Sequence, residues 1–302
     1  MEIAKIQSTE ASNKIEGIVT TRTRMKQLFE EKTTPRNRDE DEIMGYRDVL
    51  NTIHESHDYI PVRPSYILQL HKDLLAKAGL SYGGHLKNVQ NYISKTRADG
   101  TMVTRFTPVE PFCTPDAVEN LCHAYEQAIS GERIDALILI PSFIIDFLCI
   151  HPFNDGNGRM SRLLTTLLLY RSDYEIGRYI SLEAKIADTK SDYYDALEAS
   201  QTGWHEGNDD PTPFIKYLLG TILAAYKDFE DRFSIIEEKL PAVEIVRKAT
   251  LTKIGKFTKQ DIIELCPSLS LSSVEGSLRK LVQSGDIKRE GVGKGTFYYR
   301  VK

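Results

Sequence analysis

The stretch from His151 to Arg162, HPFNDGNGRMSR, gathers the residues of this chain best suited to chemistry on phosphates. It joins the apolar run FIIDFLCI to a second apolar pattern, RMSRLLTTLLLY, and both runs predict helices. The glycines and asparagines between them cannot continue a helix, so the stretch should form a loop that opens the second helix. Free backbone N–H groups and the helix dipole favour an anion at such a place.

The spacing within this loop suits a polyphosphate. Gly156 and Gly158 permit positive φ and carry no Cβ, so successive N–H groups can converge into an anion-binding nest. Arg159 and Arg162 are three residues apart and share one face of the predicted helix. Two guanidinium groups beside a nest can hold phosphates through bidentate contacts.

Two further residues could act on a bound phosphate ester. Asp155 offers a hard oxygen ligand of the kind that Mg²⁺ prefers. His151 is the one residue of the loop that can take a proton near neutral pH. Each feature alone is more often structural, since an Asn-Gly turn, a histidine before proline or an arginine near an acid is common. Their joint occurrence at a helix start favours a catalytic loop.

The same stretch resembles the signature of the Fic family, His-x-Phe-x-(Asp/Glu)-Gly-Asn-Gly-Arg-x-x-Arg, and matches it at every defined position. The resemblance extends over most of residues 1–235 and includes the segments YYDAL and DDPTPFIKYLL. It implies a mainly α Fic helical fold with a β-hairpin flap, and transfer of AMP from ATP to a hydroxyl group of a target protein. Self-modification is included in that expectation.

The resemblance also implies a role for each loop residue. His151 would deprotonate a serine, threonine or tyrosine of the target, Asp155 would hold Mg²⁺ on the α- and β-phosphates, and Phe153 would anchor the loop. The remaining residues would hold ATP: Gly156, Asn157 and Gly158 the α-phosphate, Arg159 the β-phosphate and Arg162 the γ-phosphate. Members that bind ATP in the opposite direction typically lack the second loop glycine and the final arginine. UMP or phosphocholine transfer stays open, because the motif does not read the base.

Two other segments complete the expected site. Tyr193 and Tyr194 could wall an adenine pocket, because aromatic faces stack on bases, although one of the pair could pack in the core instead. Asp99-Gly100 between two extended runs predicts a hairpin over residues 87–106, which resembles the Fic flap and could pair with a target segment. The family often has arginine where this chain has Lys87, so no contact is assigned to Lys87.

A segment near the start of the chain predicts how the loop is restrained. SNKIEG places Ser12 and Glu16 four residues apart on one helical face, and Gly17 should end that helix. The segment resembles the Fic inhibitory motif, (Ser/Thr)-x-x-x-Glu-(Gly/Asn). This resemblance implies an ion pair between Glu16 and Arg162 at the γ-phosphate position. Alternatively, Glu16 orients a water that removes AMP from a modified target.

Two other groups of residues invite a metal or redox interpretation. HESHDY places His54 and His57 three apart beside an acid, as zinc sites do, but no further ligand cluster accompanies them and a solvated helix end is expected. His71 should be a packed helical histidine. The four cysteines show no Cys-x-x-Cys pairing, and Cys149 and Cys266 lie in apolar runs, so buried free thiols in a reducing cytoplasm are expected.

The last part of the chain has a different character from the rest. Residues 239–302 carry 13 Lys and Arg against 6 Asp and Glu, a net charge of +7, which leaves −11 on the remainder of a chain whose total is −4. Three short helical patterns and a glycine-rich hairpin predict a winged helix, with Thr258 and Ser270 or Ser272 as helix caps. Such a unit could contact DNA or dock on a protein, including a second copy of the chain.

The 302 residues are therefore divided into an N-terminal segment (1–45) with the inhibitory helix, a Fic catalytic domain (46–237) and a winged helix (238–302). The longest apolar run, ALILIPSFIIDFLCI, is too short to cross a bilayer, and no secretory signal opens the chain. A cytoplasmic protein without a membrane partner is expected. A competing interpretation from another class is a DNA-binding regulator whose Fic domain senses a nucleotide.

Overall fold

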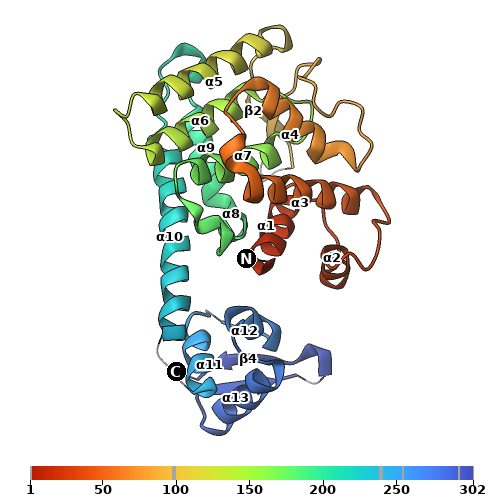
Figure 1. The fold of residues 1–302 in the computed structure, drawn as a ribbon, viewed down its shortest axis with the longest axis vertical. Coiled ribbons are helices and arrows are strands. Elements are labelled where there is room, and N and C mark those ends of the chain that lie inside the picture. The colour runs from red at the N-terminus through yellow and green to blue at the C-terminus, as the bar shows by residue number, and fades with distance from the viewer. Residues whose placement is uncertain (1, 97–99, 238–240, 254, 292, 302) are drawn as a thin grey trace. The chain divides into compact units, whose positions relative to one another are not determined.

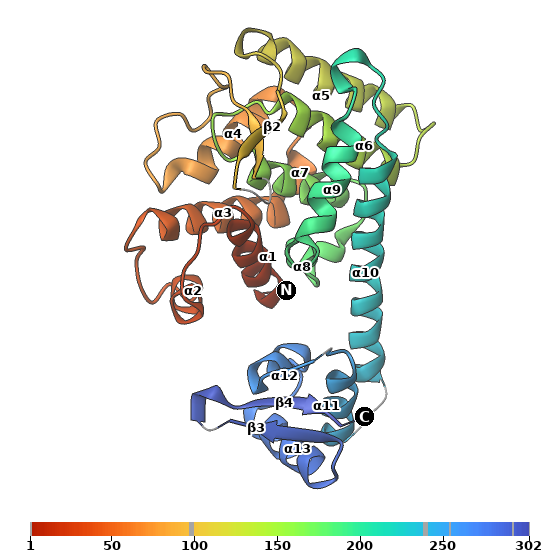
Figure 2. The ribbon, with the colours of Figure 1, turned by 180° about the vertical axis from the view of Figure 1, so that it is seen from behind.

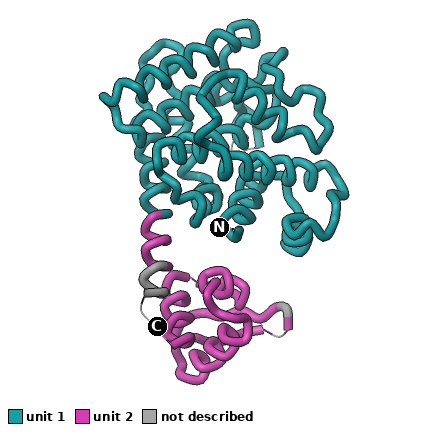
Figure 3. Tube along the Cα trace, in the orientation of Figure 1, with its two compact units in different colours: residues 1–225 teal, residues 226–302 magenta. Residues whose placement is uncertain are grey.

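The computed structural model describes residues 2–96, 100–237, 241–253, 255–291 and 293–301 (Figure 1). The chain divides into two compact units, residues 1–225 and 226–302 (Figure 3). The division falls within helix α10 (Thr212–Glu237), whereas the boundary expected from the sequence falls at the end of that helix. The N-terminal segment packs into the first unit, where its first helix lies against later helices.

The first unit is almost entirely helical. Its helices before α10 are α1 (Glu2–Ile15), α2 (Arg22–Phe29), α3 (Arg38–Ser56), α4 (Pro64–Ala76), α5 (Thr114–Ser130), α6 (Ala136–Ile150), α7 (Asn157–Arg171), α8 (Leu182–Asp188) and α9 (Lys190–Gln201). Several begin where the sequence supplies an N-cap, because the side chain accepts a backbone N–H of the first turn. These caps are Thr21, Asn37, Asp135 and Ser181.

Helix α7 forms the centre of the first unit and packs against α6, α3 and α1 (Figure 2). Every residue from Arg159 to Tyr170 is buried, so the start of this helix is enclosed by its neighbours. Helices α3 and α4 cross closely at Gly45, where a Cβ would overlap the carbonyl oxygen of Leu74. The apolar run expected as a buried helix is α6, and no helix among the described residues is long and apolar enough to cross a membrane.

The expected hairpin is present between α4 and α5. Strands β1 (Ile93–Thr96) and β2 (Met102–Phe106) are antiparallel, with Ile93 opposite Phe106 and Thr96 opposite Met102. Of the predicted Asp99-Gly100 turn, Asp99 lies outside the described residues, and Gly100 has a φ of 82°.

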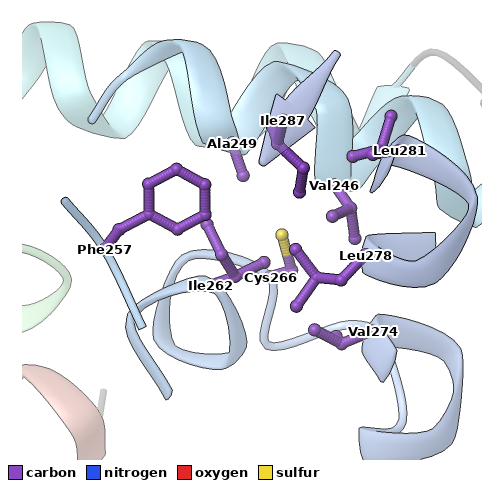
Figure 4. Packing of buried hydrophobic residues seen from close by; sticks show 9 residues of the cluster. All are labelled: Val246, Ala249, Phe257, Ile262, Cys266, Val274, Leu278, Leu281 and Ile287. Carbon is purple, nitrogen blue, oxygen red and sulfur yellow. The ribbon is translucent and has the colours of Figure 1, made fainter. Parts of the chain in front are cut away.

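The second unit has its own hydrophobic core (Figure 4). It contains α11 (Ala242–Leu251), α12 (Lys259–Leu265), α13 (Leu271–Gln283) and the antiparallel strands β3 (Ile287–Glu290) and β4 (Phe297–Arg300). Thr258 forms a capping box with Asp261, and Ser270 caps α13, as predicted. Phe257 bridges to Tyr298 and stacks on its ring, which ties the segment before α12 to the hairpin.

The expectation of a solvated helix end at His54 and His57 is wrong. Both side chains are buried and lie edge-on to the ring of Tyr170, with centroid distances of 5.3 and 5.5 Å. Burial, followed by nearby positive charge, lowers the pKa of His54 to about 4. Within the described ranges, no three His, Cys, Asp or Glu residues gather as metal ligands. Cys149 and Cys266 are buried free thiols, as expected.

Candidate active site

The loop between α6 and α7 turns sharply at both ends. His151, directly after α6, has a left-handed conformation (φ 51°, ψ 63°) and donates its N–H to the carbonyl of Phe147 at 2.9 Å. Gly156 precedes α7 with a φ of 84°, a conformation that glycine adopts without strain. The loop therefore presents the imidazole of His151 beside the N-terminal end of α7.

The middle of the loop is held by the side chains of Asn157 and Phe153. The side chain of Asn157 accepts the N–H of Phe153 at 2.9 Å and donates to its carbonyl at 2.8 Å. The buried ring of Phe153 stacks on His71, with centroids 3.6 Å apart, which confirms that Phe153 anchors the loop. Because the side chain of Asn157 is engaged in this way, its backbone N–H is the group left to face a phosphate.

His71 is a packed histidine, as expected, and it supports the loop through both ring nitrogens. Its Nδ1 accepts the N–H of Gly84 at 3.0 Å, so the ring proton lies on Nε2, which donates to the carbonyl of Asp155 at 3.0 Å. Burial lowers the pKa of His71 to about 4 and keeps the ring neutral. A Cβ at Gly156 would come within 3.4 Å of this ring.

A cavity of about 590 Å³ opens in front of the loop. Its lining brings together segments that are far apart in the sequence: Glu16, strand β1, the loop 151–156, the first turns of α7, and α9. This volume lies within the range of small-molecule sites, roughly 300–1,000 Å³. Every loop residue predicted to take part in catalysis or ATP binding lines it.

His151 is suited to accept a proton in this cavity. Burial, followed by the positive charge of Lys87, lowers the pKa of His151 to about 4. The imidazole is therefore neutral at pH 7, which is the form that can act as a general base.

Arg162 is buried and bound to residues that lie nearly 150 positions earlier in the chain. Its Nη2 donates to Glu16 Oε1 at 2.7 Å and to the carbonyl of Ser12 at 3.0 Å, and its Nε donates to Ser12 Oγ at 2.7 Å. Burial is the largest single influence and alone would lower the pKa of Arg162, but Glu16, Tyr193 and Tyr46 together raise it. The expected ion pair between Glu16 and Arg162 is present. A Cβ at Gly158 would overlap the Glu16 carboxylate, so this glycine allows the acid to reach the start of α7.

Helix α1, which ends directly before Glu16, is held by polar contacts. Lys190 donates to the carbonyl of Ile15 at 2.8 Å, and Ser8 donates to Ser181 at 2.9 Å. The buried face of α1 includes Ser8, Thr9, Ser12 and Asn13 together with Ala4, Ala11 and Ile15. Small and polar side chains therefore form most of this interface.

Arg159 is held by an acid that the sequence interpretation missed. Its Nη1 lies 2.7 Å from Glu42 Oε2, with both side chains almost completely buried, and its Nη2 lies 3.9 Å from Asp155 Oδ1. Arg38 extends the cluster, since its Nε donates to Glu42 at 2.6 Å. An acid on the inward face of an amphipathic helix was the available signal, but Glu42 stands among several acids in a charged run and nothing in the sequence distinguishes it from them.

The carboxylate of Asp155 suits a metal ion that binds together with the phosphates of a substrate. Its carboxylate is 46% exposed, accepts the N–H of Gly156 at 2.6 Å and lies 3.4 Å from the Tyr82 hydroxyl. One carboxylate is too few for a site made by protein alone. Mg²⁺ is commonly held by one or two carboxylates together with substrate phosphates, and this donor set suits that arrangement.

The two tyrosines of α9 lie in different surroundings. Tyr193 is 3% exposed and its ring contacts Tyr194, Phe214 and Tyr217 at centroid distances of 5.3, 5.9 and 5.6 Å. Tyr194 is half-buried, lines the cavity and lies 5.8 Å from the ammonium of Lys190. Tyr193 also lines the cavity, but Tyr194 is the more exposed of the pair and is the better placed to contact a base.

Known proteins that are similar to this chain point to one family. A model of the Fic/DOC family matches residues 61–169. Protein adenylyltransferase fic-1 of Caenorhabditis elegans is 26% identical over 186 residues, which make up 60% of this chain and 32% of that protein. Protein adenylyltransferase Fic of Drosophila grimshawi is 26% identical over 155 residues, 50% of this chain and 27% of that protein. The match thus spans no more than a third of either relative.

Solved structures show the same fold. The crystal structure of a Fic family protein from Desulfovibrio desulfuricans G20 is 20% identical and has a TM-score of 0.62, covering 99% of this chain and 86% of that chain. A Fic domain containing signaling protein from Bacteroides thetaiotaomicron is 24% identical with a TM-score of 0.61, covering 74% and 84%. Residues 61–169, which carry the loop and most of α7, therefore form a Fic/DOC family domain, homologous to proteins named adenylyltransferases.

Proposed function

We propose that this protein transfers AMP from ATP to a serine, threonine or tyrosine hydroxyl of a target protein, and to itself. The observation that carries the proposal is the cavity in which a neutral His151 faces the N-terminal end of α7 together with Arg159 and Arg162. A proton acceptor and an anion-binding end of a helix are the two parts that phosphoryl transfer requires. The names of the relatives from C. elegans and D. grimshawi support the same reaction.

The residues of the loop divide the chemistry among them. The target oxygen forms a bond to the α-phosphorus while the bond from that phosphorus to the bridging oxygen breaks and pyrophosphate leaves. His151 accepts the proton of the target hydroxyl. The N–H groups at the start of α7 hold the α-phosphate oxygens, and Arg159 and Arg162 hold the leaving phosphates. Asp155 would hold Mg²⁺, which supplies positive charge to the phosphates when bound.

Glu16 restrains this reaction in the proposal. Its carboxylate lies 2.7 Å from Arg162, where the γ-phosphate of ATP would bind. ATP must therefore displace Glu16 before its phosphates can take the productive position. A detached or neutralised Glu16 would release Arg162 for ATP, which makes α1 an inhibitory helix.

Labelling in lysate tests the proposed function. Glu16→Gly protein incubated with Mg²⁺ and ATP labelled in the α-phosphate should transfer label to one or more proteins, and wild-type protein should label them weakly. Glu16→Gly combined with His151→Ala is the control that should abolish labelling. Absence of α-label with the Glu16→Gly protein would exclude AMP transfer, and mass spectrometry of labelled bands would identify target and acceptor.

Two alternatives use the same site. Removal of AMP, with Glu16 orienting water, predicts that Glu16→Gly stops release of AMP from a premodified target while it increases addition. Another nucleotide or phosphocholine donor predicts label from UTP or CDP-choline, but not from ATP, on the same acceptor. Parallel incubations with the three donors separate these outcomes.

For the second unit, we propose a winged helix that contacts the phosphates of duplex DNA. A groove of about 750 Å³ is lined by Lys259, Arg279 and Arg289, and its acid, Glu275, is paired with Lys259 at 2.6 Å. Among the residues that the structure describes, Arg279 and Arg289 have no ion-pair partner. The charge of Arg279 acts on Glu275, whose pKa is lowered first by Lys259 and then also by Arg279, and two guanidinium groups from α13 and β3 suit backbone phosphates rather than base edges.

A mobility-shift titration tests this contact. Arg279→Glu with Arg289→Glu should weaken duplex binding and flatten its salt dependence, because fewer counterions are released. Lys280→Glu, an exposed charge outside the groove, is the matched control. If wild-type protein does not bind duplex at low salt, sedimentation should be used to distinguish a homodimer from a monomer that docks on another protein. Duplex binding without any AMP transfer would instead favour a DNA-binding regulator with a nucleotide-sensing domain.

A further inference from the structure

Lys87 carries a buried positive charge close to His151. The residue lies between α4 and β1 and is only 3% exposed. Its ammonium donates to the carbonyl of Ile150 at 2.9 Å and to Asn91 Oδ1 at 3.2 Å. Within the described part of the chain it has no carboxylate partner, and burial lowers its pKa to about 8. A buried ammonium without an acid is unfavourable for stability, so its surroundings need an explanation.

The hydrogen bonds of Lys87 span the histidine. Its side chain bonds the carbonyl of Ile150, on one side of His151, and its own backbone N–H donates to the carbonyl of Pro152, on the other side, at 2.8 Å. Asn91, which accepts from Lys87, also donates to the carbonyl of Phe153 at 3.0 Å. Lys87 and Asn91 together therefore bind three carbonyl groups along the loop.

His151 needs such support because its backbone is strained. A left-handed conformation is unfavourable for a residue with a Cβ, and the proline that follows His151 restricts it further. Strained residues persist only where the surrounding structure holds them in place. The two hydrogen bonds from Lys87 lie directly on either side of this residue.

The charge of Lys87 also acts on the imidazole. The charged groups that influence His151 are Lys87 and Arg105, which disfavour its protonation, and Glu16, which favours it. Lys87 has the largest effect of the three. Loss of its charge should therefore make the imidazole easier to protonate.

We propose that Lys87 is the positioning residue of His151: it fixes the peptide groups on both sides of the strained histidine. The inference rests on the proposed AMP transfer, because it assigns His151 as the base. Lys87 itself need not contact ATP, since its ammonium is directed at the loop backbone.

The test compares variants of Lys87 in the activated Glu16→Gly protein. Lys87→Met should lower kcat by about 100-fold, the loss that a misplaced catalytic group can cause, with the KM for ATP nearly unchanged. Lys87→Arg keeps the charge and the donors and should restore most of kcat. Lys227→Met, which removes an exposed lysine on α10, is the matched control and should have no effect.

A second readout does not depend on activity. An NMR titration of the His151 imidazole should show a midpoint near 4 with Lys87 and a higher midpoint, toward 6.5, in Lys87→Met. Lys87→Gln retains a donor, so it serves if Lys87→Met does not fold. The inference is overturned if folded Lys87→Met keeps kcat within about threefold of the Glu16→Gly protein, or if the His151 midpoint does not rise. No labelling by the Glu16→Gly protein itself would refute the proposed function, and the titration would still report on Lys87.

Discussion

Replacing Glu16 by glutamine should activate AMP transfer, and the structure sets the size of the effect. The substitution keeps the shape of the side chain but removes the charge that binds Arg162 at 2.7 Å. Breaking a fully buried ion pair costs about 3–5 kcal/mol. The Glu16 side chain is 33% exposed, so solvent weakens the pair, and about 2–3 kcal/mol is the appropriate range. The contacts of Arg162 with Ser12 remain and hold the guanidinium in place.

In the variant, ATP would no longer have to break this ion pair in order to bind Arg162. The value of kcat/KM for ATP should therefore rise by about 30- to 150-fold. The assay is initial-rate incorporation of α-labelled AMP into purified target or into the protein itself, across a range of ATP concentrations. Glu10→Gln, which removes a charge from α1 outside the cavity, is the matched control. A rise of less than about threefold, or an equal rise with Glu10→Gln, would refute competition between Glu16 and ATP at Arg162.

Other predictions follow from buried groups of the first unit. Burial lowers the pKa values of His54 and His151 to about 4, below the ordinary 6.5. The free energy of unfolding should therefore be highest above pH 6.5 and should fall by about 3 kcal/mol for each histidine as the pH drops toward 4. A free energy of unfolding in urea that does not change between pH 6.5 and 4 would contradict this. Glu42→Gln should leave Arg159 buried without its carboxylate partner and lower the free energy of unfolding by about 3–5 kcal/mol. Thermal unfolding measures this loss of stability, and an unchanged Tm would contradict the prediction. Gly45→Ala should destabilise the unit by more than about 1–3 kcal/mol, because the new Cβ overlaps backbone of α4 that cannot rotate away; a stable variant would show that the two helices can separate.

The spacing of the loop residues was enough to predict where they lie. A base, an acid, two glycines and two arginines between two helical patterns had to meet at the start of one helix, and the cavity contains them. The approach of Glu16 to Arg162 was predicted across 146 residues from the resemblance alone, since nothing in local periodicity links α1 to α7.

Other features could not be predicted because they depend on which helix faces meet. Glu42 is one of several acids in a charged run, and only the packing of α3 on α7 turns it toward Arg159. His54 and His57 look like a polar helix end until Tyr170 covers them. Helix α8 has only seven residues, too few for a clear helical period, so the sequence pattern does not predict it.

The role of Lys87 also depends on long-range packing. Its partner carbonyl, of Ile150, is 63 residues away, and a pattern of side-chain types cannot identify a backbone carbonyl as a hydrogen-bond partner. A lysine before a predicted hairpin gives no sign that it will be buried. The strained conformation of His151 was likewise not predicted, because histidine has a positive φ more often than most residues but still in only a small share of cases.

The central claim is that the loop from His151 to Arg162 moves AMP from ATP to a protein hydroxyl. The most direct measurement incubates purified Glu16→Gly protein with ATP labelled either in the α-phosphate or in the γ-phosphate, followed by intact-mass analysis. The account predicts α-label and a mass increase of one AMP, no γ-label, and neither signal when His151 is alanine. Retained γ-label would indicate phosphate transfer, and α-label that persists without His151 would show that another group acts as the base.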